Sequence, residues 1–150
     1  MAELVTALSE PLLSLLRQQT LVLLGTTDAQ TDSPAISAIS WVYAVNAKTV
    51  RFAIDQRSRV VANLGKQPLA VLTVFGEGTI NAIYGKARLV CEALEEVPFK
   101  LACFDVEIDT VRDAMFYGSR ISVDPEYEKT YNKQAAEKLD GQVFSAMKKA

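Results

Sequence analysis

Two arginines flank a serine at Arg57-Ser58-Arg59, directly after an alternating apolar segment. Ser58 stands where a helix N-cap is expected, because apolar residues recur after it with helical spacing. The N-terminus of a helix presents unpaired backbone N–H groups and the positive end of the helix dipole, so it favours an anion. Two guanidinium groups beside a hydroxyl would add charge-assisted hydrogen bonds. The pattern predicts a phosphate-binding site, although a solvated arginine pair in a loop would account for the same three residues.

Basic residues are concentrated in the middle of the chain. Residues 35–91 carry a net charge of +5, whereas residues 1–34 carry −3 and residues 92–150 carry −4. The whole chain has a net charge of −2. A basic centre within an acidic protein indicates a local anion site rather than a nucleic-acid-binding surface, for which a basic domain is expected.

The chain contains no histidine. This excludes Ser–His and Cys–His nucleophilic catalysis and histidine-ligated zinc or haem sites. The spacing of Cys91 and Cys103 fits no metal motif, and we expect both to be buried, reduced thiols. No catalytic residue and no metal ligand is nominated, so redox chemistry would need a bound cofactor.

Length and hydropathy favour one domain, spanning residues 1–150, with a core of its own. Apolar runs stay shorter than the roughly 20 residues of a membrane span. The N-terminal sequence MAELVTALSE lacks the basic start of a secretory signal. We therefore expect a cytoplasmic protein with no membrane segment.

The chain reads mainly as strands between helical ends. Alternation and apolar runs predict six strands, over residues 21–26, 35–45, 49–54, 69–75, 79–91 and 99–108. Helical spacing and capping residues predict helices over 2–18, 58–66 and 109–116, another starting at 124–126, and a last one capped by Asp140. Tyr127 and Tyr131, four residues apart, are interpreted as packing residues. Mainly consecutive strands favour a mainly β, α+β fold: a six-stranded antiparallel barrel with flanking and C-terminal helices.

The order of these segments resembles the pyridoxamine 5′-phosphate oxidase-like, FMN-binding split-barrel superfamily, particularly its small general stress proteins. The resemblance runs over about residues 12–108. It is most specific at Ser58-Arg59, at the Asn63–Pro68 helix exit and at Gly85-Lys86-Ala87. It implies a split barrel that forms a homodimer, with FMN in a cleft at the subunit interface. A deazaflavin coenzyme, which some relatives bind, is the alternative cofactor.

The resemblance also implies which residues bind the cofactor. In chain order they are Ser37, Ser40, Trp41, Phe52, Ala53, Arg57, Ser58, Arg59 and Asn81. Ser58 and Arg59 would hold the phosphate with Arg57 adjacent, and the segment 37–41 would line the isoalloxazine ring. Phe52 and Ala53 would approach the ribityl chain, and Asn81 would contact the ring. Trp41 would serve equally well as a core or interface aromatic residue.

Two departures argue against oxidation of pyridoxamine phosphate. The oxidase has a lysine after the phosphate-binding arginine, where this chain has Val60, and its C-terminal arginine–histidine motif needs a histidine. The leading hypothesis is a flavin-dependent oxidoreductase of unknown substrate, reduced by a nicotinamide or another electron donor. The alternatives are a non-catalytic stress protein that binds a flavin or another phosphate ligand, and a dimeric scaffold without a ligand.

Overall fold

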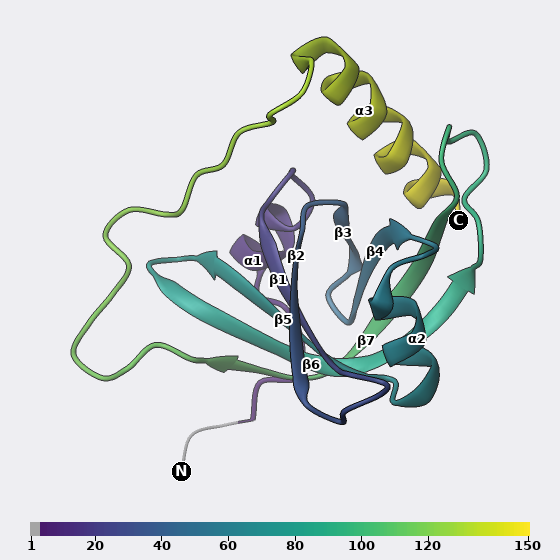
Figure 1. The fold of residues 1–150 in the computed structure, drawn as a ribbon. Helices are drawn as coiled ribbons and strands as arrows, with labels where there is room; N and C mark the ends of the chain where they lie inside the picture. The colour runs from purple at the N-terminus through teal and green to yellow at the C-terminus, as the bar shows by residue number, and fades with distance from the viewer. Residues whose placement is uncertain (1–3) are drawn as a thin grey trace.

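The computed structural model describes residues 4–150, which form seven strands and three helices (Figure 1). The elements in chain order are α1 (Glu10–Leu15), β1 (Val22–Thr27), β2 (Pro34–Ile39), β3 (Val42–Asn46), β4 (Thr49–Asp55), α2 (Arg59–Lys66), β5 (Leu69–Gly76), β6 (Thr79–Cys91), β7 (Leu101–Asp113) and α3 (Lys133–Lys149). All strands belong to one antiparallel sheet with the order β2-β1-β5-β6-β7-β4-β3. The predicted α+β class and split-barrel fold are confirmed, with seven strands instead of six.

The two edge strands of this sheet are neighbours in the sequence. β2 and β3 stand at opposite ends of the strand order, yet only Ser40 and Trp41 separate them. The three Cα–Cα steps from Ile39, the last residue of β2, to Val42, the first of β3, span at most roughly 11 Å. The sheet must therefore curl until its edges meet. The barrel is therefore split at this junction, which we call the seam. The prediction of a single strand over 35–45 was wrong because the chain changes sheet edge at the seam.

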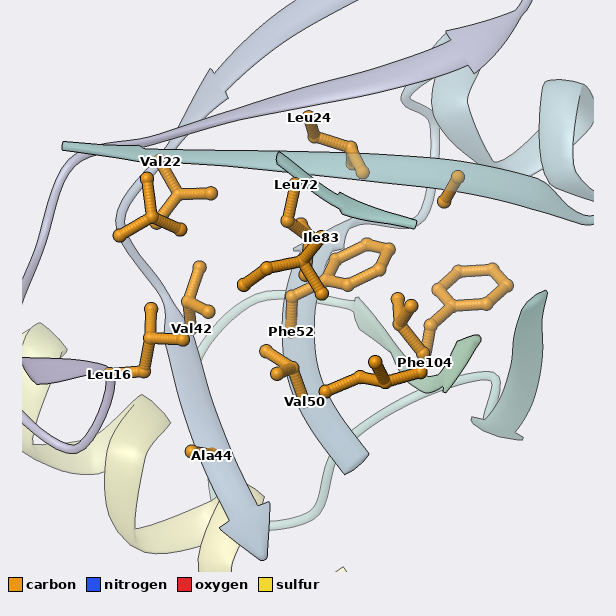
Figure 2. Close-up of a cluster of buried hydrophobic side chains, with 14 of the residues drawn as sticks. Leu16, Val22, Leu24, Val42, Ala44, Val50, Phe52, Leu72, Ile83 and Phe104 are labelled. Atoms are coloured by element: carbon orange, nitrogen blue, oxygen red, sulfur yellow. The ribbon is translucent and has the colours of Figure 1, made fainter. Parts of the chain in front are cut away.

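Apolar side chains fill the inside of the barrel (Figure 2). The rings of Phe52 and Phe104 stack there, with centroids 5.4 Å apart and planes inclined by 15°. Leu16, which follows α1, and Leu72 and Ile83 from β5 and β6 are fully buried in the same cluster. Burying a side chain of this size stabilises the fold by about 1.5–3 kcal/mol. This packing fixes the strands that carry the seam.

The predicted N-terminal helix was too long. Within the described residues, α1 covers Glu10–Leu15, with Ser9 as its N-cap. The preceding segment instead bonds to the barrel through its backbone, because Leu8 donates to the carbonyl of Ala47 and Val5 accepts from the N–H of Val111. Residues 2 and 3 of the predicted helix lie outside the described part of the chain. Backbone hydrogen bonds to the barrel therefore replace the helix that the apolar spacing predicted before Ser9.

The C-terminal predictions also need correction. β7 continues through Asp113, where a helix was expected over 109–116, because its second half pairs with β6. The start at 124–126 begins no helix, since the exposed side chains around it offer no face to bury. α3 begins later, at Lys133, with Asn132 as its N-cap, and Asp140 lies inside it rather than at its start. A long connecting segment joins β7 to α3 (Figure 1). α3 itself lies beside β3 and β4.

Both cysteines carry free thiols, as predicted, but the expected burial holds only for Cys103. They stand opposite each other in the β6–β7 pair, with Cys103 buried and Cys91 half-buried. Among the described residues, the structure contains no helix that is long and apolar enough to cross a membrane.

Candidate functional site

A pocket of about 520 Å³ lies at the seam of the barrel. Three parts of the chain form its walls: residues 37–41 at the seam, residues 53–55 with Ser58 where β4 leads into α2, and Lys129, Tyr131 and Leu139 from the C-terminal segment. The backbone ties the first two walls together, because the carbonyl of Trp41 accepts a hydrogen bond of 3.0 Å from the N–H of Ala53. The pocket therefore follows directly from the way the sheet edges meet.

Five of the residues predicted to bind a cofactor line this single pocket, namely Ser37, Ser40, Trp41, Ala53 and Ser58. The oxygen of Ser58 accepts a hydrogen bond of 3.2 Å from the N–H of Val60, which confirms its predicted position as the N-cap of α2. The first turn of α2 contains no acidic residue. Its positive end therefore remains available to an anion.

Phe52 and Asn81 do not line the pocket. Alternation along β4 turns the side chain of Ala53 toward the pocket and the ring of Phe52 into the core, against Phe104. Only the backbone of Phe52 could contact a ligand from this position. Asn81 lies on β6, where its side-chain amide donates to the carbonyl of Val74 at 3.3 Å and to that of Gly76 at 3.2 Å. These bonds secure the β5–β6 hairpin.

The two predicted phosphate arginines lie beside the pocket rather than in its walls. Arg57 binds Asp55 at 3.2 Å, and Arg59 binds Asp28 at 2.9 Å. Their side chains are 91% and 80% exposed. The Arg57–Asp55 pair is exposed and contributes only about 0–1 kcal/mol, so Arg57 can leave it for a stronger anion. The Arg59–Asp28 pair is partly buried, because the side chain of Asp28 is only 13% exposed. Asp55 itself lines the pocket, and the side-chain hydrogen bonds of Arg57 lower the pKa of this carboxyl group.

Asp140, which was predicted to cap the last helix, lies next to the pocket. This buried carboxylate accepts a hydrogen bond of 2.8 Å from the indole N–H of Trp41 and another of 2.8 Å from the amide of Gln19. The ammonium of Lys129 lies 3.5 Å from the same group. In the sequence, Asp140 stands at helical spacing from the apolar residues Ala136 and Val143, which the structure buries on one face of α3. This spacing could have predicted that Asp140 faces the barrel.

Tyr131 was interpreted as a packing residue, but it is half-exposed and lines the pocket together with Lys129 and Leu139. No motif marked Lys129 or Leu139, and the spacing of Tyr131 from Tyr127 predicted only packing. Leu139 belongs to α3, which packs beside β3 and β4, and Lys129 and Tyr131 lie in the segment that leads into this helix. Their contribution to the pocket depends on tertiary structure that local patterns do not contain.

The family model described as pyridoxamine 5′-phosphate oxidase matches residues 8–106. Solved structures with a similar fold include General Stress Protein 26 from Bacillus anthracis str. Sterne (11% identity, 65% of this chain and 86% of that chain covered, TM-score 0.53). Another is an FMN-binding protein from Syntrophomonas wolfei subsp. wolfei (18% identity, 71% of this chain and 86% of that chain covered, TM-score 0.52). A third is an F420 reductase (14% identity, 70% of this chain and 98% of that chain covered, TM-score 0.59).

At these identities the structural matches show a shared fold. No curated protein is significantly similar to this chain in sequence. The family match covers more than half of the chain and includes the seam and the start of α2. The chain therefore belongs to the pyridoxamine 5′-phosphate oxidase family.

Proposed function

We propose that this protein binds FMN in the seam pocket and acts as a flavin-dependent oxidoreductase. The observation that carries the proposal is the convergence of Ser37, Ser40, Trp41, Ala53 and Ser58 on one pocket. The family match supports a flavin-type ligand, and one structure of the same fold is named an FMN-binding protein. A deazaflavin is the alternative ligand, since another neighbour is named an F420 reductase.

The chemistry of the pocket fits a phosphorylated, flat heteroaromatic ligand. Its volume of about 520 Å³ lies within the range of small-molecule sites. Trp41 and Leu139 offer apolar surface to a ring, and the hydroxyls of Ser37 and Ser40 offer hydrogen bonds. The hydroxyl of Ser58 and the positive end of α2 would hold the phosphate, joined by the guanidinium of Arg59 when it leaves Asp28. When bound, FMN would supply the electron or hydride transfer.

We extend the proposal to a homodimer with the pocket at the subunit interface. Every residue of the edge strand β2 is exposed or only partly buried. Near it, an apolar groove on the outer face of the sheet contains Ile36, Leu69 and Tyr84, whose exposed fractions are 75%, 46% and 44%. Exposed apolar surface of this kind favours association. Light scattering after size-exclusion chromatography should give twice the chain mass of 16.4 kDa.

Absorption spectroscopy tests the function directly. Purified protein incubated with FMN and freed of excess should keep the flavin bands. Arg59→Ala should weaken FMN binding by about tenfold but leave riboflavin binding unchanged, because riboflavin lacks the phosphate. Arg120→Ala, at an exposed position outside the pocket, is the matched control. Failure of the wild-type protein to retain FMN would overturn the proposal.

A nicotinamide is the proposed electron donor, and anaerobic addition of NADH or NADPH should bleach the bound flavin. Bound flavin that neither nucleotide reduces would identify a non-catalytic flavin-binding protein instead. Because the chain has no histidine, we do not propose pyridoxamine phosphate as the substrate.

A further inference from the structure

The C-terminal segment supplies one wall of the seam pocket, although it lies beyond the part of the chain that matches the family. The match ends at residue 106, whereas Lys129, Tyr131 and Leu139 line the pocket. α3 holds this wall in place, because Val143 and Met147 are fully buried against the barrel. Any ligand in the pocket would therefore contact residues that the matched region does not provide.

Lys129 is the only cation among the described residues that line the pocket. Its side chain is 27% exposed, and its ammonium lies 3.5 Å from the carboxylate of Asp140. Two other donors, the indole of Trp41 and the amide of Gln19, bind that carboxylate more closely, at 2.8 Å each. An ammonium carries three N–H donors, and this ion pair is too long to be a strong hydrogen bond. The same ammonium lies over the ring of Tyr127, 5.7 Å from its centroid, a contact that uses the charge but no directed hydrogen bond. Lys129 therefore keeps N–H donors for a further partner.

Lys129 and Ser58 lie on different walls of the pocket. Asp140 joins the ammonium to the indole of Trp41, so this cation lies near Trp41. Ser58 lies on the wall where β4 leads into α2. A ligand with its phosphate at Ser58 would place its ring near Trp41 and Lys129.

We propose that Lys129 binds the ring of the ligand, as a hydrogen-bond donor to the carbonyl-bearing edge of a flavin-type heterocycle, and that Asp140 positions it. This inference rests on the proposed function. It assigns the phosphate to the start of α2 and the ring to the C-terminal segment. The two assignments can be separated because FMN and riboflavin share the ring and differ in the phosphate.

The test compares the affinities of Lys129→Gln for FMN and for riboflavin. Quenching of Trp41, the only tryptophan in the chain, reports binding of both. We expect both affinities to fall by about fivefold, with their ratio unchanged, because a partly exposed charged hydrogen bond contributes modestly. Lys129→Arg, which keeps the cation, should stay within about twofold of the wild type. Lys133→Gln, at an exposed position of α3 outside the pocket, should bind both ligands like the wild type.

Each other outcome would overturn the assignment. Unchanged affinities in Lys129→Gln would show that Lys129 does not contact the ligand, and a loss for FMN alone would place it at the phosphate. A wild-type protein that binds riboflavin and FMN equally would overturn the assignment of the phosphate to the start of α2. A wild-type protein that binds neither would refute the proposed function and this inference together. Thermal unfolding of each variant verifies that the fold is intact.

Discussion

Arg51 and Asp105 form a two-pronged ion pair inside the protein. The Nε of Arg51 donates to Oδ1 of Asp105 at 2.7 Å, and Nη2 donates to Oδ2 at 3.1 Å. The remaining Nη1 donates to the carbonyls of Met147 and Ala150, at 2.8 and 2.7 Å. One side chain of β4 thus binds both β7 and the end of α3, where the helix dipole is negative. This contact helps to hold the C-terminal wall of the pocket in place.

Arg51→Ala should therefore destabilise the protein strongly. The change leaves Asp105 buried with Arg88 as its remaining ionic partner, at 3.2 Å. Breaking a buried pair typically lowers the free energy of unfolding by about 3–5 kcal/mol. Urea denaturation measures this loss, and hydrogen exchange should show faster exchange in α3. Arg57→Ala, which breaks an exposed pair with Asp55, should change the stability by less than about 1 kcal/mol. Equal effects of the two variants would contradict the anchoring role of Arg51.

Two glycines offer a matched pair of substitutions. A Cβ at Gly85 would lie 2.3 Å from the carbonyl oxygen of Glu107, where the β6–β7 register shifts, so the strands must separate to admit it. Gly85→Ala should lower the free energy of unfolding by more than about 2 kcal/mol. At Gly141, inside α3, nothing lies within 4 Å of the added atom.

Gly141→Ala should instead raise the free energy of unfolding by about 0.5–1 kcal/mol, because alanine loses less backbone entropy in a helix. Thermal unfolding of both variants provides the comparison. Destabilisation by Gly141→Ala would show that α3 is more tightly enclosed than the structure indicates.

Acid should destabilise the protein through Asp28. Backbone hydrogen bonds from Thr31 and Gln30 lower the pKa of this carboxyl group below its ordinary value of 3.8. A carboxyl group whose pKa is lowered by folding contributes stability above its unfolded pKa and loses that contribution as the pH falls through its folded pKa. The melting temperature should therefore fall below about pH 4, and less steeply in Asp28→Asn. An Asp28→Asn variant with the slope of the wild type would contradict this assignment, and exposed Asp124→Asn is the control.

High pH should destabilise the folded protein through ionisation of the buried thiol of Cys103. Burial raises the pKa of this group from 9.0 to about 12. A group whose neutral form is favoured by folding contributes stability below its unfolded pKa and loses it as the pH rises, here from about 9 toward 12.

At pH 8, a thiol-specific disulfide reagent should modify half-buried Cys91 before Cys103, which should react only on unfolding. Labelling of Cys91→Ser in the native state and in urea measures this, and fast native labelling would contradict it.

Local sequence patterns predicted much of the barrel. The strand at 79–91 and the helix after Ser58 lie where alternation and capping placed them, because the solvent-facing and core-facing sides of these elements differ clearly. The seam was not predicted, since Ser40 and Trp41 continue the apolar pattern of the strands on either side. Only the closure of the sheet separates β2 from β3.

The pocket, like the barrel, combines residues that local patterns predict with residues that only the folded chain brings together. Ser58 could be predicted from a local cap, and Trp41 from the resemblance to a known family. Asp140 was interpreted as a helix cap, whereas its partners Trp41 and Gln19 are more than ninety residues away in the sequence. Contacts over such separations depend on the assembled fold.

The strand order also determines when the binding pocket can exist during folding. The hairpins β1–β2 and β3–β4 stand at opposite ends of the sheet, and the strands that join them, β5 to β7, come later in the chain. The seam therefore cannot close until β7 pairs with β4, and closing such long loops slows folding. Partly folded chains would lack the complete site, so a ligand of this pocket would select the finished barrel and shift the folding equilibrium toward it.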